Sequence, residues 1–417
     1  MARACGIDFG TSNSTVGWLR PNAPILLPLE DGKVTLPSVV FFNAEENSSH
    51  FGRDALNEYL TGYEGRLMRS LKSILGTSLI DGQTEVMGRA LRFRDLLSYF
   101  IGELKVRGEA AAQHEFRQVV MGRPVHFVDD DQEADQRAED TLADIAKSCG
   151  FEEVSFQFEP IAAAFDYEQQ ISSEELVLIV DIGGGTSDFS LVRLSPDRRQ
   201  LVDRKDDILG NAGVHIGGTD FDRRLSLETV MPLLGYRTGL KHRNAEIPSS
   251  YYFNLATWHT INLAYTRKVW AELQDVMRDV AEPVKFKRLL TLIDDKAGHE
   301  LAMRVEAAKI TLSSELQTEI DLDIAEVDLS HEISQADFFQ AIDPEVNRVA
   351  ATVDGMLKTA GLNAAHIDTV FFTGGSSGIP HLRAKIASVL PAARHVEGDL
   401  FGSIGAGLAI DAARRYG

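Results

Sequence analysis

The chain has 417 residues, with 42 Lys and Arg against 62 Asp and Glu, and therefore a formal net charge of −20 at pH 7. Such a field repels phosphate, so nonspecific binding to nucleic acid or to an anionic membrane surface is disfavoured. The content of 44% apolar and 25% charged residues is that of an ordinary globular protein, which excludes collagen, coiled coil and bulk disorder. At roughly 150 residues per domain, the length predicts two or three domains.

The cysteines and the apolar runs indicate where the protein works. Two cysteines, Cys5 and Cys149, cannot build a disulfide framework, and no C-x-x-C spacing is present. The N-terminus lacks the apolar region of a signal peptide, and the apolar run at 176–180 is far too short to span a bilayer. We therefore expect a cytoplasmic protein with no membrane partner.

The first predicted elements form a hairpin at 4–19, in which a short apolar strand leads through a turn of glycine and hydroxyl residues into a second strand. The pattern returns at 176–194, where the sequence LVLIVDIGGGTSDFSLVRL again carries an aspartate into a glycine turn. The aspartates Asp8 and Asp181 are 173 residues apart (181 − 8), a separation that favours a duplicated domain over a solenoid.

Helices are predicted between the two hairpins at three places, 93–105, 131–150 and 161–167. A strand is expected at 151–158, and the region 249–314 is strongly helical, with an apolar stripe that indicates core packing. A third strand and glycine turn follow at 369–378, and Pro380 begins another helix. Because strands and helices alternate in both halves, the predicted fold class is α/β, with two lobes facing a cleft.

The turns carry the chemistry. Glycines let backbone amide groups approach an anion, hydroxyls add donors, and a carboxylate can hold hydrated Mg²⁺. For either turn alone, a structural glycine turn is an equally good interpretation. Two copies, with Asp8, Asp181 and Asp188 at strand ends, favour a site that clamps one polyphosphate. The sequence has no Walker A, G-x-G-x-x-G or H-E-x-x-H motif, which disfavours a kinase fold, a Rossmann fold and a zinc site.

Several segments resemble a known superfamily. In chain order, four are similar to motifs of the actin, sugar-kinase and heat-shock chaperone ATPases: 7–14 (IDFGTSNS), 180–188 (VDIGGGTSD), 217–222 (GGTDFD) and 373–376 (TGGS). Two resemble the nucleotide-binding domain of heat-shock protein 70 (DnaK) chaperones: 159–164 (EPIAAA) and 306–314 (EAAKITLSS). Two are most similar to the YegD-type branch of that family: 122–127 (GRPVHF) and 401–407 (FGSIGAG). The resemblance spans nearly the whole chain and implies an actin-like ATPase fold of two duplicated ribonuclease-H-like lobes around a nucleotide cleft.

The resemblance also implies a domain organisation. Lobe I would occupy 1–170, with a small subdomain at about 36–114, and lobe II would occupy 171–417, with a subdomain at about 217–324, the adenosine wall and a C-terminal helix. We expect the protein to lack the peptide-binding domain of these chaperones, because no segment of the sequence resembles it. Client or co-chaperone proteins are therefore expected to use a surface other than that domain and its linker.

ATP or ADP with Mg²⁺ is the ligand that the resemblance implies. The residues expected to bind the nucleotide are Gly10, Thr11, Ser12, Asn13, Gly183, Gly184, Gly185, Gly217, Gly218, Glu306, Lys309, Ser313, Gly374, Gly375, Ser376 and Asp399. Those expected to organise Mg²⁺, mostly through water, are Asp8, Asp181 and Asp188. Those expected to act in catalysis are Lys72, Glu159, Asp181 and Thr186. Phosphoryl transfer needs a cation, Mg²⁺ and an oriented water, and the resemblance implies that Lys72 supplies the cation. Without the resemblance, the sequence would predict Lys72 to be a surface lysine of a helix.

The sequence departs from the family pattern at the adenine. The two arginines that usually sandwich the base are replaced by Ile310 and Gly378. Cation stacking contributes on the order of 1 kcal/mol per contact, so we expect weaker or less base-selective nucleotide binding. Nanomolar ATP affinity in calorimetry would contradict this expectation.

The leading hypothesis is a slow, Mg²⁺-dependent ATPase of chaperone type whose lobes close around the nucleotide. A small-molecule kinase on the same fold is an alternative, which substrate-dependent ADP release would support. A filament-forming actin-like protein is another; sedimentation with ATP tests it, and the segment 306–314 argues against it. Aromatic residues at 251–258 lie in the connection 223–305, which is longer than in ordinary chaperones of the family. Core packing is their default interpretation, and a lid over the nucleotide or a partner surface is the alternative.

Overall fold

The computed structural model describes residues 3–128, 131–199, 201, 204–242, 244–322, 329–400 and 402–417. The chain forms two compact units: the first comprises Met1–Gly217, Val349–Gly378 and Arg383–Gly417, and the second comprises Gly218–Arg348 and Ile379–Leu382. The predicted boundary at residue 170 separates two sheets that both belong to the first unit, and it stays a prediction. Phe401 of the motif at 401–407, and residues 323 and 324 of the predicted subdomain, lie outside the described residues.

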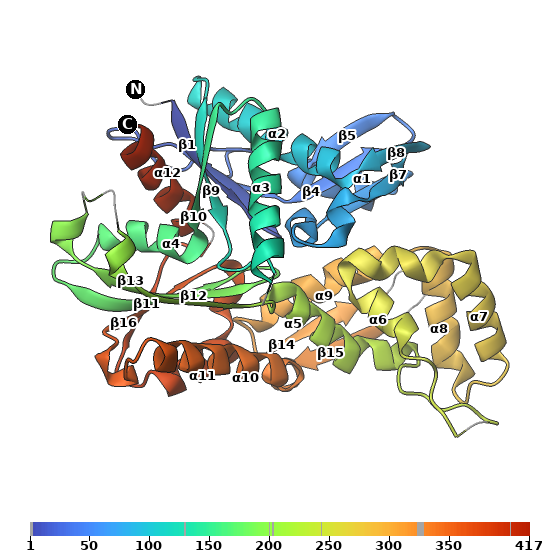
Figure 1. Cartoon of the computed structure of the whole chain (residues 1–417). Helices are drawn as coiled ribbons and strands as arrows, with labels where there is room; N and C mark the ends of the chain where they lie inside the picture. The colour runs from blue at the N-terminus through green and yellow to red at the C-terminus, as the bar shows by residue number, and fades with distance from the viewer. Residues whose placement is uncertain are drawn as a thin grey trace. The chain divides into compact units, whose positions relative to one another are not determined.

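The first unit contains two five-stranded sheets (Figure 1). The order in one sheet is β10-β9-β1-β2-β3, made of β1 (Ala4–Phe9), β2 (Asn13–Gly17), β3 (Thr35–Pro37), β9 (Gln118–Arg123) and β10 (Glu153–Phe158). The order in the other is β13-β12-β11-β16-β17, made of β11 (Glu175–Ile182), β12 (Ser187–Leu194), β13 (Ile208–Val214), β16 (Thr369–Thr373) and β17 (Arg394–Glu397).

The two sheets have the same topology. In each, the first three strands along the chain are antiparallel neighbours, and the last two continue the sheet parallel to the first strand. This repetition confirms the duplication that the spacing of the two hairpins predicts.

Further elements of the first unit lie around these sheets. Its helices are α1 (Gly52–Thr61), α2 (Phe93–Ala112), α3 (Gln132–Ser148), α4 (Glu159–Glu168), the end of α10 (Gln335–Thr359), most of α11 (Pro380–Val389) and α12 (Ser403–Tyr416). Its smaller sheets are formed by β4 (Val39–Asn43), β5 (Ser48–Phe51) and β6 (Gly65–Arg69), and by β7 (Gln83–Val86) and β8 (Arg89–Arg92). All the predicted helices before residue 170 are present, and α2 is longer than expected.

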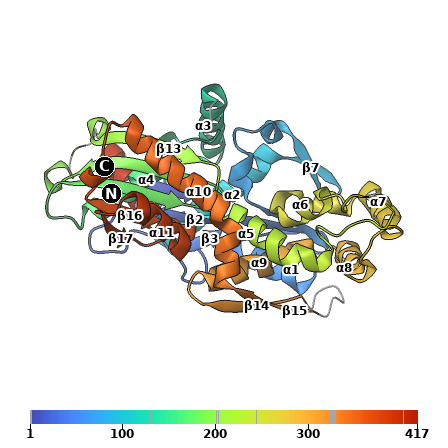
Figure 2. The ribbon, with the colours of Figure 1, turned by 90° about the horizontal axis from the view of Figure 1, so that it is seen from below.

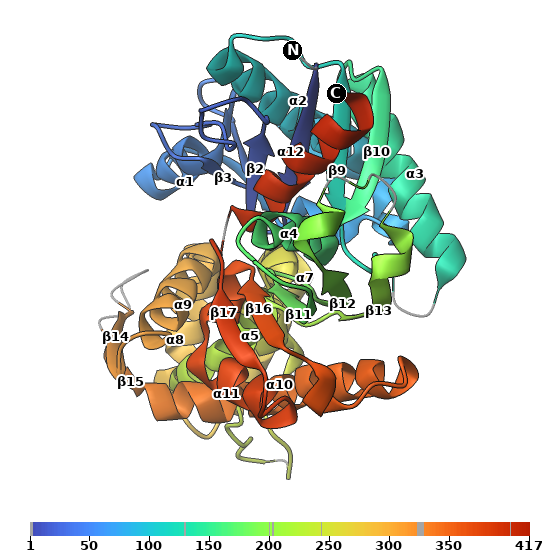
Figure 3. The same ribbon diagram turned by 90° about the vertical axis from the view of Figure 1, so that its left-hand side faces the viewer.

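The last helix, α12, packs across the first sheet beside α4 (Figure 3). Its residues 403–412 are all buried. The close packing of α12 requires glycine at two positions. A Cβ at Gly407 would lie 1.7 Å from the carbonyl oxygen of Ala162 in α4, and a Cβ at Gly6 of β1 would lie 2.4 Å from the backbone nitrogen of Ala409. Real Cβ atoms do not come this close, so glycine at both positions lets α12 lie directly on the sheet.

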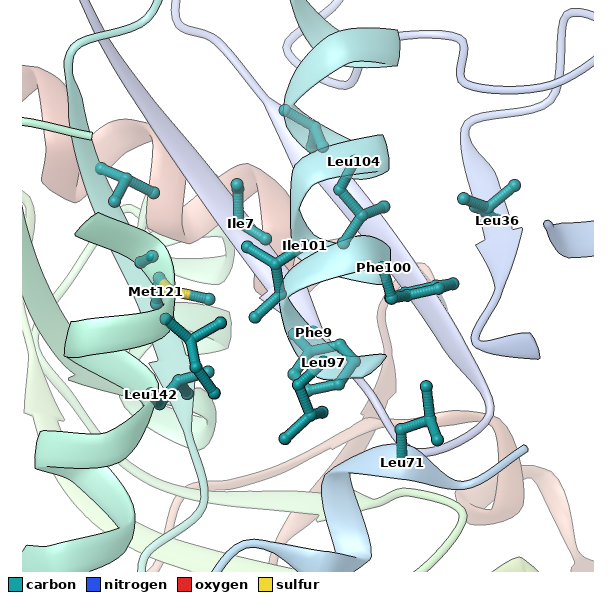
Figure 4. Close-up of a cluster of buried hydrophobic side chains, with 14 of the residues drawn as sticks. Ile7, Phe9, Leu36, Leu71, Leu97, Phe100, Ile101, Leu104, Met121 and Leu142 are labelled. Atoms are coloured by element: carbon teal, nitrogen blue, oxygen red, sulfur yellow. The ribbon is translucent and has the colours of Figure 1, made fainter. Parts of the chain in front are cut away.

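The helix α2 packs on the opposite face of the same sheet. Since alternate residues of a strand point to opposite faces, Ile7 and Phe9 of β1 lie on the face away from Gly6. Figure 4 shows these two side chains among fully buried residues of α2, which include Leu97, Phe100, Ile101 and Leu104. Each such side chain contributes about 1.5–3 kcal/mol when buried. The packing on both faces holds β1, and the turn that follows it, in a fixed position.

The second unit is mainly helical (Figure 2). It contains α5 (Gly218–Leu225), α6 (Ser250–Ala256), the 3₁₀ helix η7 (Trp258–Tyr265), α7 (Arg267–Met277), α8 (Pro283–Asp294), α9 (Gly298–Leu312), the hairpin of β14 (Gln317–Asp321) and β15 (Ser330–Ser334), and the first part of α10. The helical character predicted at 249–314 is confirmed. Tyr251 and Tyr252 are buried as expected of core residues, whereas Phe253 is exposed.

Among the described residues, no helix combines the length and the apolar character that crossing a membrane requires. Both Cys5 and Cys149 have free thiols.

Candidate phosphate-binding site

Two glycine-containing turns, one from each sheet, lie in contact within the first unit. The first turn joins β1 to β2 and carries Thr11 and Ser12. The second joins β11 to β12, and the Gly183 N–H closes it by donating to the Thr186 carbonyl at 3.0 Å. A Cβ at Gly184 would lie 2.3 Å from Ser12 Oγ and 3.4 Å from Thr11 Cβ. The structure thus brings together the two turns that the sequence predicts to share one polyphosphate.

Neighbouring residues fix both turns. Gly217 packs on the second turn so closely that a Cβ there would lie 2.6 Å from the carbonyl carbon of Gly184. On the first turn, Ser38 Oγ donates to the Gly10 carbonyl at 2.7 Å, and the Ser38 N–H donates to the Ser12 carbonyl at 2.9 Å. The backbone amides of the turns are therefore held in place by the protein before any ligand arrives.

Three buried aspartates lie at the strand ends next to these turns. Asp8 is the second-last residue of β1, and Asp181 of β11 pairs directly with Asp188 of β12. Their exposed fractions are 8%, 3% and 2%. Burial, reinforced by the charge of Glu159, raises the pKa of Asp8 and of Asp188 to about 7. The pKa of Asp181 lies well above its ordinary value for the same reasons, with Asp188 and Asp8 adding to the effect.

Lys72 supplies a positive charge to this acidic cluster. It lies in the 3₁₀ helix η1 (Leu71–Ile74) and is buried, so the surface position that the sequence alone predicts is wrong. It forms an ion pair with Glu159, the first residue of α4. Burial alone would lower the pKa of Lys72, but the charges of Glu159 and Asp8 and a hydrogen bond to Glu159 outweigh it and raise that pKa. The adjacent Leu71 belongs to the core cluster of Figure 4, which anchors the lysine backbone.

The carboxylate oxygens show what the cluster can hold. Asp188 Oδ1 accepts a hydrogen bond from the Val125 N–H at 2.8 Å. Within the part of the chain that the structure describes, Asp188 Oδ2 and Asp181 Oδ1 are buried without a hydrogen-bond partner. Buried oxygens of this kind call for an ion or water, and carboxylates that keep a water shell suit Mg²⁺. The residues present therefore fit Mg²⁺.

The third predicted turn lies beside Asp181. Thr373 pairs with Asp181 across β16 and β11. Gly374 follows with a φ of 79°, and a Cβ at that position would lie 2.3 Å from Asp181 Oδ1. Both the left-handed backbone and the close approach require glycine.

Residues after this turn differ in how enclosed they are. Gly375 begins the 3₁₀ helix η9 (Gly375–Gly378), in which Ser376 is buried. Asp399 has an exposed side chain, and its carbonyl accepts hydrogen bonds from the backbone and hydroxyl of Ser403 at the start of α12.

The remaining predicted residues belong to the second unit. They are Gly218 at the start of α5, Glu306 and Lys309 in α9, and Ser313 at its C-cap. Lys309 is buried, forms an ion pair with Asp222 at 2.9 Å and donates to the Gly218 carbonyl at 3.3 Å, so partners in its own unit satisfy its charge. Ile310, which follows it, is 62% exposed.

Two sheets of identical topology, joined by paired glycine turns at a shared carboxylate cluster, define the actin-like ATPase class of fold. The chain belongs to the heat-shock protein 70 family: the family model described as Hsp70 protein matches residues 4–233 and 274–413. Members of this family are ATP-binding proteins of chaperone type. The segment 234–273, which contains α6, lies outside the match. The YegD-type branch is not distinguished by the match and stays a prediction.

One contact at the site, the hydrogen bond from the Val125 N–H to Asp188, was not predicted from the sequence. Residues 124–127 follow the end of β9, and the backbone N–H of Val125 among them donates to Asp188. A signal was present in α3, where Asp135 and Glu139 are four residues apart and so share one helix face. A pair of acids on a partly buried face requires a cation, and in the structure Arg123 is that cation.

Proposed function

We propose that the protein binds ATP with Mg²⁺ and hydrolyses it slowly, as a chaperone-type member of its family. The observation that carries this proposal is the meeting of two glycine turns, a buried lysine and four carboxylates: Asp8, Glu159, Asp181 and Asp188. Four carboxylates around one lysine leave an excess of negative charge in a buried site. A divalent cation removes that excess and at the same time brings the phosphates that the turns are shaped to bind.

The turns would hold the phosphates. Thr11, Ser12 and Asn13 are suited to the β-phosphate, since hydroxyls and backbone N–H groups of the turn donate hydrogen bonds. Residues 183–186 are suited to the γ-phosphate, because the absent side chains at Gly184 and Gly185 leave the amides open to an anion. Phosphoryl transfer is catalysed largely by such positioning.

The charged residues would carry the remaining roles. Asp8, Asp181 and Asp188 would hold Mg²⁺, mostly through water, and Mg²⁺ when bound supplies charge neutralisation at the phosphates. Lys72 would place its ammonium against the phosphoryl group, held by its ion pair with Glu159. Glu159, with Thr186, would orient the attacking water.

Phosphate release and calorimetry with ATP and Mg²⁺ test the proposal. Loss of one group that stabilises developing charge costs about 10²–10³ in kcat, so Lys72→Ala should lower turnover at least about 100-fold. Lys105→Ala is the matched control, because Lys105 is a half-buried lysine whose ion pair with Glu109 lies in α2. Its turnover should equal that of the wild type. A wild-type protein that neither binds nor hydrolyses ATP, or equal turnover in the two variants, would overturn the proposal.

Three further assignments belong to the same proposal. Nucleotide affinity is weaker than the family norm, because Ile310 and Gly378 occupy the adenine positions. The lobes divide at residue 170. The protein works in the cytoplasm, which the two free thiols support, with client or co-chaperone proteins as partners.

A further inference from the structure

We infer that Arg123 is a positioning residue that holds residues 124–127 so that the Val125 N–H stays directed at Asp188. The inference deepens the proposed function and rests on it for the effect on turnover. We call the contacts of Arg123 with residues 124–127 and with α3 the clamp, and its geometry is independent of any nucleotide.

The guanidinium of Arg123 joins the segment to α3. Arg123 is buried at the end of β9. It donates to the carbonyls of the two residues that follow it, Pro124 at 3.1 Å and Val125 at 3.3 Å. The same guanidinium forms ion pairs with Asp135 at 2.6 Å and with Glu139. One side chain thus contacts both the segment and two carboxylates of the helix.

The far end of the segment is fixed by the same helix. The Phe127 N–H donates to Asp135 Oδ1 at 2.6 Å, so the carboxylate that pairs with Arg123 also holds the last residue of the segment. The guanidinium lies over the rings of Phe127 and Phe158, with its carbon 5.2 Å and 5.0 Å from the centroids. These rings shield the ion pairs from water, which strengthens them.

Between these two anchors lies Val125, whose N–H donates to Asp188 Oδ1 at 2.8 Å. This bond uses one oxygen of Asp188 and leaves Oδ2 without a partner among the described residues. The Val125 amide and the Thr186 side chain both hydrogen-bond this carboxylate, so the orientation of the free oxygen depends in part on the Val125 amide, and the position of that amide depends on Arg123.

The clamp needs arginine rather than any cation. A guanidinium offers five N–H donors in a planar fork, which suffices for two carbonyls and two carboxylates. A lysine ammonium has three donors on a flexible stem and cannot reproduce this geometry. Arg123→Lys consequently keeps the charge and removes the positioning.

The variant Arg123→Lys tests the inference in ATP turnover. Loss of a residue that orients a metal ligand costs about 10–100-fold in metal affinity or activity. We expect kcat to fall about tenfold and the half-saturating Mg²⁺ concentration to rise by a similar factor, while KM for ATP stays within about twofold. The matched control is Arg117→Lys, because Arg117 precedes the other end of β9, pairs with Glu115 and Glu152, and is 40% exposed. Its kcat and Mg²⁺ dependence should be those of the wild type.

A second measurement needs no nucleotide. Hydrogen exchange should show the Val125 amide protected in the wild type and exchanging about tenfold faster in Arg123→Lys, while Val119 and Val120 inside β9 exchange as before. If the wild type has no ATPase activity, the proposed function fails and this measurement alone decides the inference. Should Arg123→Lys not fold, Glu139→Gln removes one of the two ion pairs and should accelerate the same amide by about threefold.

Two results would overturn the inference. One is an unchanged exchange rate at Val125 in the folded variant. The other is a fall in melting temperature in Arg123→Lys with kcat and Mg²⁺ dependence unchanged, because a merely structural arginine would produce that outcome.

Discussion

Replacing Asp8 by asparagine should stabilise the nucleotide-free protein at pH 8 and abolish Mg²⁺-dependent turnover. Asp8 is buried at the end of β1, and burial together with the charge of Glu159 raises its pKa to about 7 from 3.8. Asparagine has the same shape without the charge. The substitution should therefore remove the cost of burying a charge beside Glu159, which the folded apo protein otherwise carries.

The sign and size of the change in the free energy of unfolding follow from the raised pKa of Asp8. With a folded pKa above the unfolded one, the folded state binds more protons, so the free energy of unfolding falls as pH rises between the two values. The fall is at most about 1.4 kcal/mol per pH unit and is complete above about pH 7. Over a shift of about three units, ionised Asp8 lowers stability by up to about 4 kcal/mol. At pH 8 Asp8→Asn should recover about 2 kcal/mol or more of this, and at pH 5, where folded Asp8 is protonated, much less.

Urea denaturation at pH 5 and pH 8, in EDTA and without nucleotide, measures the effect. The matched control is Asp207→Asn. Asp207 is 1% exposed, but it pairs with Arg198 and with Arg204, which also pairs with Glu168. Its replacement should lower the free energy of unfolding by about 3 kcal/mol at both pH values, since Arg198 loses its buried partner and Arg204 keeps only Glu168. A loss of stability in Asp8→Asn at pH 8, or a gain of equal size at both pH values, would refute the electrostatic reasoning.

Two further predictions concern packing and metal binding. Gly407→Ala should destabilise by about 3 kcal/mol or more, because its Cβ would lie 1.7 Å from the Ala162 carbonyl. Gly355→Ala in α10, where nothing lies within 4 Å, should stabilise by about 1 kcal/mol; urea denaturation compares the two, and equal effects would contradict the packing described for α12. The half-saturating Mg²⁺ concentration for turnover should fall about tenfold or more from pH 6 to pH 8, since Asp8 and Asp188 bind the cation only when ionised and have pKa values of about 7. A flat Mg²⁺ dependence over this range would show that neither carboxylate titrates there.

The hairpins and their duplication were predictable from sequence because their signals are local. An apolar run, an aspartate and a glycine turn occupy adjacent positions, and β1–β2 and β11–β12 form where this pattern occurs. The strand order shared by the two sheets then follows from repeating the same unit. The third turn at Gly374 was predictable for the same reason.

The position of Lys72 was not predictable from local pattern. It lies in a short 3₁₀ helix, and its ion-pair partner Glu159 is 87 residues away in sequence. Only the resemblance indicates a role for it. The hydrogen bond from Val125 to Asp188 was not predictable either, because the Val125 N–H is a backbone group that every residue type except proline has. A side-chain pattern reports strands and turns, whereas these contacts arise from tertiary packing.

The strand β1 combines a local sequence pattern with tertiary packing. Each of its residues is buried, since α2 covers one face and α12 the other, and the same strand carries Asp8 as its second-last residue. A strand packed this tightly on both faces cannot move aside to expose the carboxylates to water, so their burial, reinforced by the charge of Glu159, keeps the pKa values of Asp8, Asp181 and Asp188 raised. Because the geometry is fixed beforehand, a cation that enters the cluster stabilises these buried charges without reorganising the backbone. The burial that makes the apo protein less stable is therefore the same property that prepares the site for Mg²⁺ and phosphate.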